Sequence, residues 1–303
     1  MKKWLLLFSS LVGAFVSIGF FFTNQMMYIR KKTNKEIIDR ETADGFYDEK
    51  VYNSLLKETF TTSSSFGYKL SGTVIKPHEH NQFIILCHGV TVHSLNSIKY
   101  AHLFLKNGWN VITYDHRRHG LSEGKTTSYG YYEKADLQAI VQWTKQHFEE
   151  SLQLGIHGES MGAATTLLYA GSANAKADFY IVDCPFSDLE EQLAHRLKED
   201  FHLPKQLVLP IANVVLKWRE GYSFKDVSPI SVVDQIKKPV LFIHSQEDSY
   251  ILPSMTIQLY EKKQGPKQLY IAPIGGHARS YAENREEYEK VVSNFLKSVK
   301  EPR

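Results

Sequence analysis

Three residue types that together support nucleophilic catalysis occur along the chain in the order Ser160, Asp248 and His277. A serine hydroxyl is a weak nucleophile until a neighbouring base takes its proton. His277 ends the run Ile-Gly-Gly-His, between the last expected strand and the last expected helix. Asp248 follows another expected strand and could orient the imidazole. Such a set cleaves or transfers an acyl group through a covalent acyl-serine.

The sequence from Gly158 to Gly162 reads Gly-Glu-Ser-Met-Gly. A Gly-x-Ser-x-Gly motif arises by chance about once in ten chains of this length, so its surroundings decide its meaning. An apolar run over 152–157 precedes it and a helical pattern over 163–170 follows, which predicts a strand, a sharp turn and a helix. Glycines are expected because a side chain at 158 or 162 would collide with the neighbouring strand and helix. The alternative is a glycine-rich turn with a solvated serine.

Three acids compete as the partner of His277. Asp248 is favoured, because the chain order Ser160, Asp248, His277 is the one associated with a strand–turn–helix nucleophile. Glu247 and Asp183 remain as rival acids.

Two backbone N–H groups are also needed to stabilise the oxyanion that develops during acyl transfer. The N–H of Met161, directly after the serine, is the first candidate. The second is expected from the loop His88-Gly89-Val90 that follows the strand over 83–87, and we assign it to Val90. Gly89 allows this backbone to turn towards the serine.

Short apolar runs alternate with amphipathic helical patterns from residue 57 onwards. This alternation predicts a parallel sheet covered by helices on both faces. Two of the runs form a hairpin, Lys57–Thr62 and Tyr68–Lys76, and the others are Phe83–Cys87, Asn110–Tyr114, Leu152–His157, Phe179–Asp183, Val240–His244 and Gln268–Ile271.

With these motifs the chain resembles an α/β-hydrolase of the bacterial branch that includes membrane-anchored serine-aminopeptidase-like and acyl-esterase-like hydrolases. The resemblance covers about residues 57–299 and is carried by His88-Gly89, Asp115-His116-Arg117-Arg118-His119-Gly120-Leu121-Ser122, Gly158–Gly162, Asp248 and Gly276-His277. It implies an eight-stranded, mostly parallel sheet in the order 1-2-4-3-5-6-7-8, with the first two strands antiparallel. Relatives often have small residues at the positions of Arg118 and His119, so this loop is expected to be altered.

An apolar segment, about 187–235, interrupts the alternation of strands and helices. We predict that it is a helical insertion that forms a lid over the strand ends. If the side chains of 203–218 cover Ser160, they form an apolar wall that would accept apolar acyl groups. The alternative is a set of ordinary helices packed onto the sheet.

The N-terminal residues 4–22 contain no charged side chain. As a helix they would span roughly 28 Å, about the hydrocarbon thickness of a bilayer. We therefore expect a transmembrane anchor or signal-anchor over 1–23, a linker and lead-in helix over 24–55, and the α/β-hydrolase domain over 56–303. The domain is expected to fold without the anchor. A cleaved export signal and a buried helix are the alternatives.

The orientation of this anchor rests on two opposing signals. Lys2 and Lys3 resemble the charged start of an export signal, which predicts a single-pass protein with an extracytoplasmic catalytic domain. The charges on the two sides of residues 4–22 slightly favour the opposite orientation.

The composition excludes several other classes of protein. The chain has 303 residues, with 36 basic and 33 acidic side chains. This near balance lacks the excess of positive charge that is typical of nucleic-acid-binding proteins. Cys87 and Cys184 are the only cysteines, and in the expected strand order they lie about 9–10 Å apart, too far for a disulfide. His88, His93, His116 and His119 lack metal-ligand spacing, and neither a metal nor a cofactor is expected.

We therefore expect a serine hydrolase that cleaves small carboxylic esters or related acyl compounds. Acyl transfer or peptide cleavage on the same fold is one alternative, because a fold does not determine its reaction. A non-catalytic, membrane-tethered binding protein is another, and the complete set Ser160, Asp248 and His277 argues against it. The natural substrate and the oligomeric state do not follow from the sequence.

Overall fold

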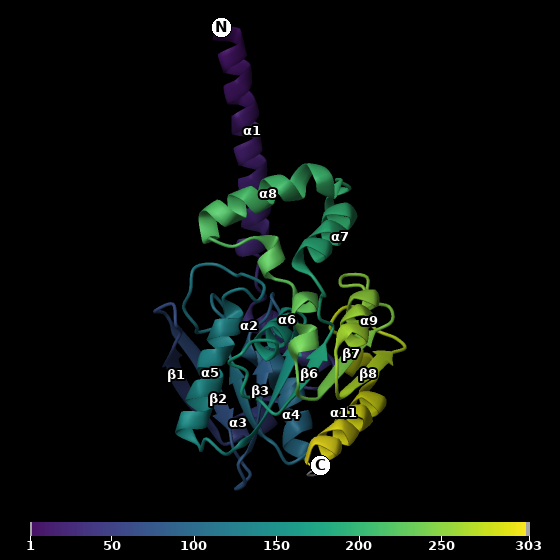
Figure 1. Cartoon of the computed structure of the whole chain (residues 1–303). Coiled ribbons are helices and arrows are strands. Elements are labelled where there is room, and N and C mark those ends of the chain that lie inside the picture. The colour runs from purple at the N-terminus through teal and green to yellow at the C-terminus, as the bar shows by residue number, and fades with distance from the viewer. Residues whose placement is uncertain (1, 301–303) are drawn as a thin grey trace.

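The centre of the molecule is an eight-stranded sheet (Figure 1). The computed structural model describes residues 2–300, apart from the side chains at positions 2, 5–8 and 11–12. The strands lie in the order β1-β2-β4-β3-β5-β6-β7-β8, which confirms the predicted order. Their bounds are β1 Lys57–Ser63, β2 Lys69–Ile75, β3 Gln82–Cys87, β4 Asn110–Tyr114, β5 Gln153–Glu159, β6 Phe179–Asp183, β7 Val240–Ser245 and β8 Lys267–Ala272.

The sheet is mostly parallel. β2 runs antiparallel to β1 and to β4, and the five other neighbouring pairs are parallel. The run Phe83–Cys87 in β3 is buried along its whole length, as expected for a strand covered on both faces. Because parallel strands end at the same edge of a sheet, the residues after β5 and β7 meet there. These are Ser160 and Asp248.

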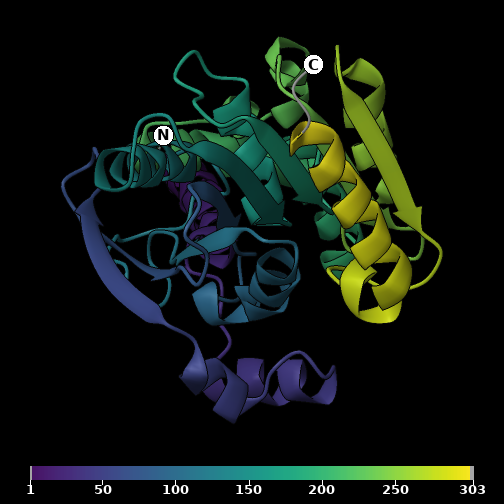
Figure 2. The ribbon, with the colours of Figure 1, turned by 90° about the horizontal axis from the view of Figure 1, so that it is seen from below.

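Helices cover both faces of the sheet (Figure 2). One face carries α5 (Glu133–His147), α6 (Met161–Ala170) and α9 (Pro253–Lys262). The other carries α4 (Ile98–Lys106), α10 (Ser280–Glu283) and α11 (Arg285–Lys300). Both clusters of buried side chains take residues from the sheet and from the helices above it, so the core has two apolar layers.

The chain between β6 and β7 is largely helical. It contains α7 (Leu189–Phe201), α8 (Lys205–Glu220) and the short 3-10 turns η2 (Phe224–Asp226), η3 (Pro229–Ser231) and η4 (Val233–Gln235). Asp188 begins α7 by accepting hydrogen bonds from two backbone N–H groups, and Gly221, with a φ of 78°, ends α8. In Figure 1, α7 and α8 cross the molecule between the sheet and the N-terminus.

Residues 4–22 lie in a long helix, α1 (Lys2–Met27). The prediction that they form a single-pass membrane anchor, with an extracytoplasmic catalytic domain, is wrong. Among the described residues, no helix has the length and apolar character needed to cross a membrane. This overturns the transmembrane and signal-anchor assignment of residues 1–23, of which residue 1 lies outside the described part of the chain.

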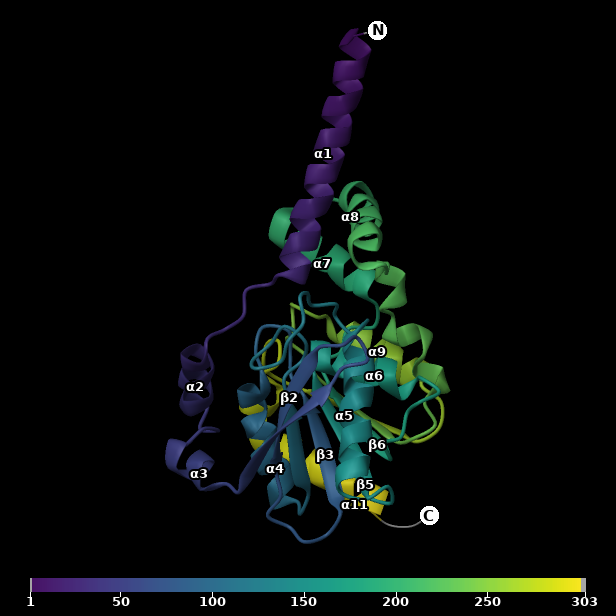
Figure 3. The same cartoon turned by 90° about the vertical axis from the view of Figure 1, so that its left-hand side faces the viewer.

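The second half of α1 packs against the protein itself (Figure 3). Gly19 lies so close to α8 that a Cβ atom there would be 2.3 Å from Val215 Cγ2. Phe20 packs edge-on against Trp218 of the same helix, with ring centroids 5.9 Å apart, and Met26 is buried. The apolar side chains at this end of α1 therefore have protein partners.

Two further helices, α2 (Asn34–Ala43) and α3 (Glu49–Ser54), lead from α1 to β1. α2 begins at Thr33, whose hydroxyl accepts from the backbone N–H of Glu36 while the Glu36 carboxylate accepts from the Thr33 N–H. This reciprocal cap satisfies two N–H groups at the start of the helix. The segment 24–55, expected to hold one lead-in helix, thus holds two, together with the end of α1.

Candidate active site

Ser160 lies in a strained turn between β5 and α6. Its φ of 57° and ψ of −118° are values that residues with a side chain rarely adopt. Two close approaches enforce the turn. A Cβ atom at Gly158 would lie 2.3 Å from the carbonyl oxygen of Gly162, and one at Gly162 would lie 2.1 Å from the carbonyl oxygen of Cys87. The collisions expected for side chains at 158 and 162 are therefore with α6 and with the end of β3.

Ser160, His277 and Asp248 form a continuous chain of contacts. Ser160 Oγ lies 2.8 Å from His277 Nε2, and His277 Nδ1 lies 2.7 Å from Asp248 Oδ2. Because an ionised carboxylate only accepts, Nδ1 carries the proton and Nε2 accepts from the serine hydroxyl. Ser160 and Asp248 are buried, whereas the His277 side chain keeps 22% of its surface exposed. The three residues are therefore open to solvent on the histidine side.

Four donors hold Asp248 in its ionised form. The N–H groups of Tyr250 and Ile251 donate to its Oδ1 at 2.9 and 3.0 Å, while His277 and His244 contact its Oδ2. Burial alone would raise the pKa of Asp248, but the hydrogen bonds from His244 and His277 outweigh burial and hold this pKa well below its ordinary value. The carboxylate is thus ready to stabilise a protonated imidazole.

The two rival acids lie elsewhere. Glu247 accepts a hydrogen bond from the N–H of Gly275 at 3.0 Å, so it holds the loop that carries His277. Asp183 accepts from the hydroxyl of Tyr288 at 3.1 Å, and burial raises its pKa. Neither carboxylate forms a hydrogen bond with the imidazole of His277 within the described part of the chain.

The loop after β3 passes directly beside the nucleophile. A Cβ atom at Gly89 would lie 3.6 Å from the Cβ of Ser160. Met161 is the first residue of α6, and N–H groups in the first turn of a helix have no carbonyl partner within that helix. The two predicted oxyanion donors, Val90 and Met161, therefore belong to the two segments that border Ser160.

Three buried histidines support this loop. His88 Nε2 accepts from the N–H of His116 at 2.9 Å, so its Nδ1 carries the proton and donates to the carbonyl of Gly89 at 2.7 Å. His119 Nε2 lies 2.7 Å from the carbonyl oxygen of Val90. Burial lowers the pKa of all three imidazoles, which keeps them neutral near pH 7. His88 thus holds the Gly89–Val90 peptide, which carries the Val90 N–H, and His119 holds the following peptide, Val90–Thr91. The sequence did not indicate either contact.

One group of described side chains has the spacing to hold a metal ion. It consists of Cys184, Asp248 and His277, whose ligand atoms lie within 4.8 Å of one another. Burial raises the pKa of the Cys184 thiol well above its ordinary value, so the thiol keeps the proton that a metal would have to displace. This donor set fits a metal poorly. Cys184 and Cys87 are buried, free thiols, as predicted.

Glu159, next to the nucleophile, belongs to a buried ion pair. Lys99 Nζ of α4 lies 2.6 Å from Glu159 Oε2, and each side chain is 4% exposed. Tyr100 donates to the same oxygen at 2.7 Å, and Asn96 donates to the other oxygen at 3.1 Å. Burial alone would raise the pKa of Glu159, but the Lys99 charge outweighs it and lowers the pKa to about 2. Sequence reasoning missed this pair, because only the packing of α4 on the sheet brings residues 99 and 159 together.

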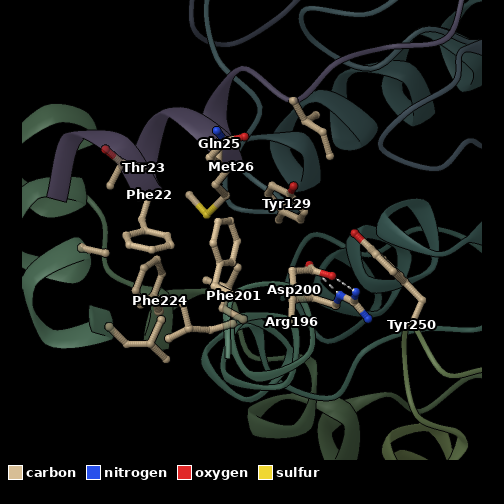
Figure 4. A pocket seen from close by; sticks show the side chains of 15 residues that line it. Phe22, Thr23, Gln25, Met26, Tyr129, Arg196, Asp200, Phe201, Phe224 and Tyr250 are labelled. Atoms are coloured by element: carbon tan, nitrogen blue, oxygen red, sulfur yellow. Dashed lines mark hydrogen bonds and ion pairs between the residues drawn. The ribbon is translucent and has the colours of Figure 1, made fainter. Parts of the chain in front are cut away.

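An apolar cavity of about 370 Å³ is lined by Tyr250 and by residues of α1, α7 and α8 (Figure 4). Its volume is within the range of small-ligand pockets. Tyr250 lines the cavity and also packs against the His277 ring, with centroids 4.9 Å apart. Ser160 itself does not line the cavity. The side chain of Tyr250 therefore separates the cavity from the contacting residues Ser160, His277 and Asp248.

The cavity is apolar at one end and charged at the other. Leu197 of α7 and Leu209 of α8 belong to its walls, and Figure 4 shows Phe22 and Phe224 at the end away from Tyr250. At the Tyr250 end, Arg196 pairs with Asp200, and the guanidinium stacks over the Tyr250 ring at 4.5 Å. Leu209 and Ala212, which line the cavity, belong to the apolar segment 203–218 that the sequence singled out, whereas no sequence pattern indicated the residues that α1 contributes.

Known proteins resemble the chain over most of its length. Residues 78–232 match the model of a family described as Serine aminopeptidase, S33. The chain is 52% identical over 300 residues to the uncharacterized protein YqkD of Bacillus subtilis (strain 168), with 99% of this chain and 98% of that protein covered. It is 23% identical over 212 residues to the lysophosphatidylserine lipase ABHD12 of Danio rerio, with 63% of this chain and 51% of that protein covered.

A solved structure shares the same fold. The esterase Pf2001 of Pyrococcus furiosus superposes with a TM-score of 0.68 at 25% sequence identity, and the match covers 83% of this chain and 95% of that one.

We predict that Lys99→Met lowers the free energy of unfolding by about 3–5 kcal/mol at pH 7, because it leaves the Glu159 carboxylate buried without a counter-charge. Lys106→Met is the matched control. Lys106 pairs with Glu289 on the surface, and its side chain is 74% exposed, so the loss should stay within about 1 kcal/mol. Urea unfolding of the two variants and the parent measures both effects.

The difference in stability between the parent and Lys99→Met should depend on pH. The folded-state pKa of Glu159 is lowered from 4.5 to about 2. Its contribution to stability is therefore complete above pH 4.5 and is lost as the pH falls towards 2. The free energies of unfolding of the parent and of Lys99→Met should differ less at pH 3 than at pH 7. If this difference in the free energy of unfolding is equally large at pH 3 and pH 7, the ion pair between Lys99 and Glu159 is not its cause.

Proposed function

The chain belongs to the family described as Serine aminopeptidase, S33, and is a serine α/β-hydrolase, and we propose that it cleaves carboxylic esters of apolar acids. The observation that carries this proposal is the unbroken contact chain from Ser160 through His277 to Asp248. The esterase name of the Pyrococcus furiosus neighbour and the lipase name of the Danio rerio relative support the choice of an ester as substrate.

In the proposed mechanism, His277 Nε2 takes the proton of Ser160 as its Oγ attacks the ester carbonyl carbon. The imidazolium that forms is stabilised by Asp248, which remains ionised because of the donors around it. The protonated His277 then gives its proton to the departing alcohol. Water, activated by the same imidazole, attacks the acyl-serine and releases the acid.

The negative charge of each tetrahedral intermediate would be stabilised by the N–H groups of Val90 and Met161. Two features support this assignment. Gly89 places the loop of Val90 against Ser160 without a side chain between them, and the hydrogen bond from His88 Nδ1 to the Gly89 carbonyl fixes the orientation of the Gly89–Val90 peptide, which carries the Val90 N–H. The N-terminal end of α6 adds a partial positive charge near Met161.

The apolar cavity beside Tyr250 is the proposed site for the acyl group. In this account the segment 187–235 acts as a lid, since α7 and α8 supply much of the cavity wall. Apolar walls favour acyl chains, and each buried methylene would improve binding by about 0.8 kcal/mol until the cavity is full.

Peptide cleavage is the second candidate, because the family description names an aminopeptidase. Recognition of a free amino terminus calls for a carboxylate without its own counter-charge near the scissile bond. Of the described residues that line the cavity, Asp200 alone is acidic, and it is paired with Arg196. This pairing favours an ester over a peptide.

We predict that Ser160→Ala lowers kcat for an activated ester by about 10³–10⁶-fold, as in other triads whose members act as a unit. Alanine fits the same backbone angles no worse than serine, so the unfolding midpoint should change little. Ser151→Ala, at an exposed serine outside the site, is the matched control and should retain parental activity. Hydrolysis of a p-nitrophenyl ester near the parental rate by Ser160→Ala would remove this residue from the mechanism.

We predict that Asp248→Asn lowers kcat by about 10⁴-fold, because an amide at this position stabilises the wrong imidazole tautomer. Glu247→Gln and Asp183→Asn are the controls, since both carboxylates bond to groups other than His277. Both controls should lose far less activity in the same ester assay. If Asp248→Asn is nearly as active as the parent while one control is inactive, the acid is misassigned.

A further inference from the structure

One wall of the apolar cavity comes from residues far away in the sequence. Phe22 and Met26 of α1, and Ile29 just beyond it, line the cavity together with α7 and α8. In Figure 4, Phe22 lies at the end of the cavity opposite Tyr250, and Met26 lies between these two ends. A chain that enters past Tyr250 would therefore meet Met26 before it reaches Phe22.

Contacts with α8 hold this wall in place. Arg219 Nη1 donates to the Thr23 hydroxyl at 2.6 Å and to the Asn24 side-chain oxygen at 2.8 Å. The same guanidinium lies over the Phe20 ring, 4.7 Å from its centroid. On the α7 side, Phe22 packs edge-on against Phe201, with centroids 5.2 Å apart. The end of α1 is thus fixed to both helices of the proposed lid.

Hydrogen bonds from the body fix the residues that follow α1. The N–H of Thr127 donates to the carbonyl of Met27 at 3.1 Å, and the N–H of Lys32 donates to the carbonyl of Thr91 at 2.7 Å. Thr91 directly follows Val90, the proposed oxyanion donor. The segment 27–32 therefore ties the cavity wall to the rim of the site, so that the wall has a defined distance from the nucleophile.

We propose that the last turns of α1, through Phe22 and Met26, set the length of acyl chain that the enzyme accepts. This inference rests on the proposed esterase function. Met26 limits the width of the cavity along its course, and Phe22 closes its far end. An N-terminal helix thereby acts as a specificity element of a site whose reacting groups all lie beyond residue 88.

The test uses the full-length chain and p-nitrophenyl esters with acyl groups of two to twelve carbons. Phe22→Ala opens the far end, so the best substrate should become longer by at least two carbons, with a gain of about fourfold in kcat/KM per added methylene. Met26→Trp fills the middle, so the best substrate should become shorter by at least two carbons. Phe15→Ala is the matched control, because Phe15 lies on the same helix, is 40% exposed and is not part of the cavity wall.

The two variants shift the profile in opposite directions, which general destabilisation cannot imitate. Unfolding midpoints show whether either variant has lost its fold. If one has, the acyl-length profile of the other variant tests the inference. Profiles of the folded variants that superpose on the parental one would overturn the inference while leaving the proposed function intact. A parent that shows no Ser160-dependent hydrolysis of any ester would instead overturn the proposed function.

Discussion

The close approach of α6 to the ends of β5 and β3 is the constraint on which the site depends. Gly158 and Gly162 allow backbone atoms to meet where a Cβ would lie 2.3 and 2.1 Å from carbonyl oxygens. This contact forces Ser160 into a strained conformation, with φ at 57°, and the Ser160 hydroxyl lies 2.8 Å from His277 Nε2. The strain is maintained because β5 is a central strand, with parallel neighbours on both sides.

Charge is separated around this turn in a way that suits acyl transfer. Beneath the nucleophile, Glu159 is neutralised by Lys99 inside the protein, so its charge adds little to the negative potential that a developing oxyanion would meet. On the open side, Asp248 keeps its charge through hydrogen bonds and faces the imidazole. The two carboxylates thus have different partners and different roles. One stabilises the turn, and the other is placed to stabilise a protonated His277.

The sequence predicts the fold and the contact chain because local patterns encode both. Apolar runs alternating with helical faces specify the sheet, and the order Ser160, Asp248, His277 places one residue after each of three strands. Contacts made by tertiary packing have no such pattern, as with Lys99 and Glu159. The error at α1 concerns residues 4–22, because a stretch without charged side chains resembles a membrane span in the sequence, whereas no described helix is long and apolar enough to cross a membrane. The contacts of Gly19 with Val215 and of Phe20 with Trp218 arise from tertiary packing, which local sequence patterns do not encode.

The central claim is that Ser160 attacks a carbonyl whose oxygen lies between two backbone N–H groups. A crystal structure of the chain after reaction with an alkyl fluorophosphonate tests it most directly, because the product mimics the tetrahedral intermediate. We expect phosphorus bonded to Ser160 Oγ, with a phosphonyl oxygen at about 2.7–3.1 Å from the nitrogen atoms of Val90 and Met161. Phosphorus on another residue, or a phosphonyl oxygen directed away from both N–H groups, would contradict it.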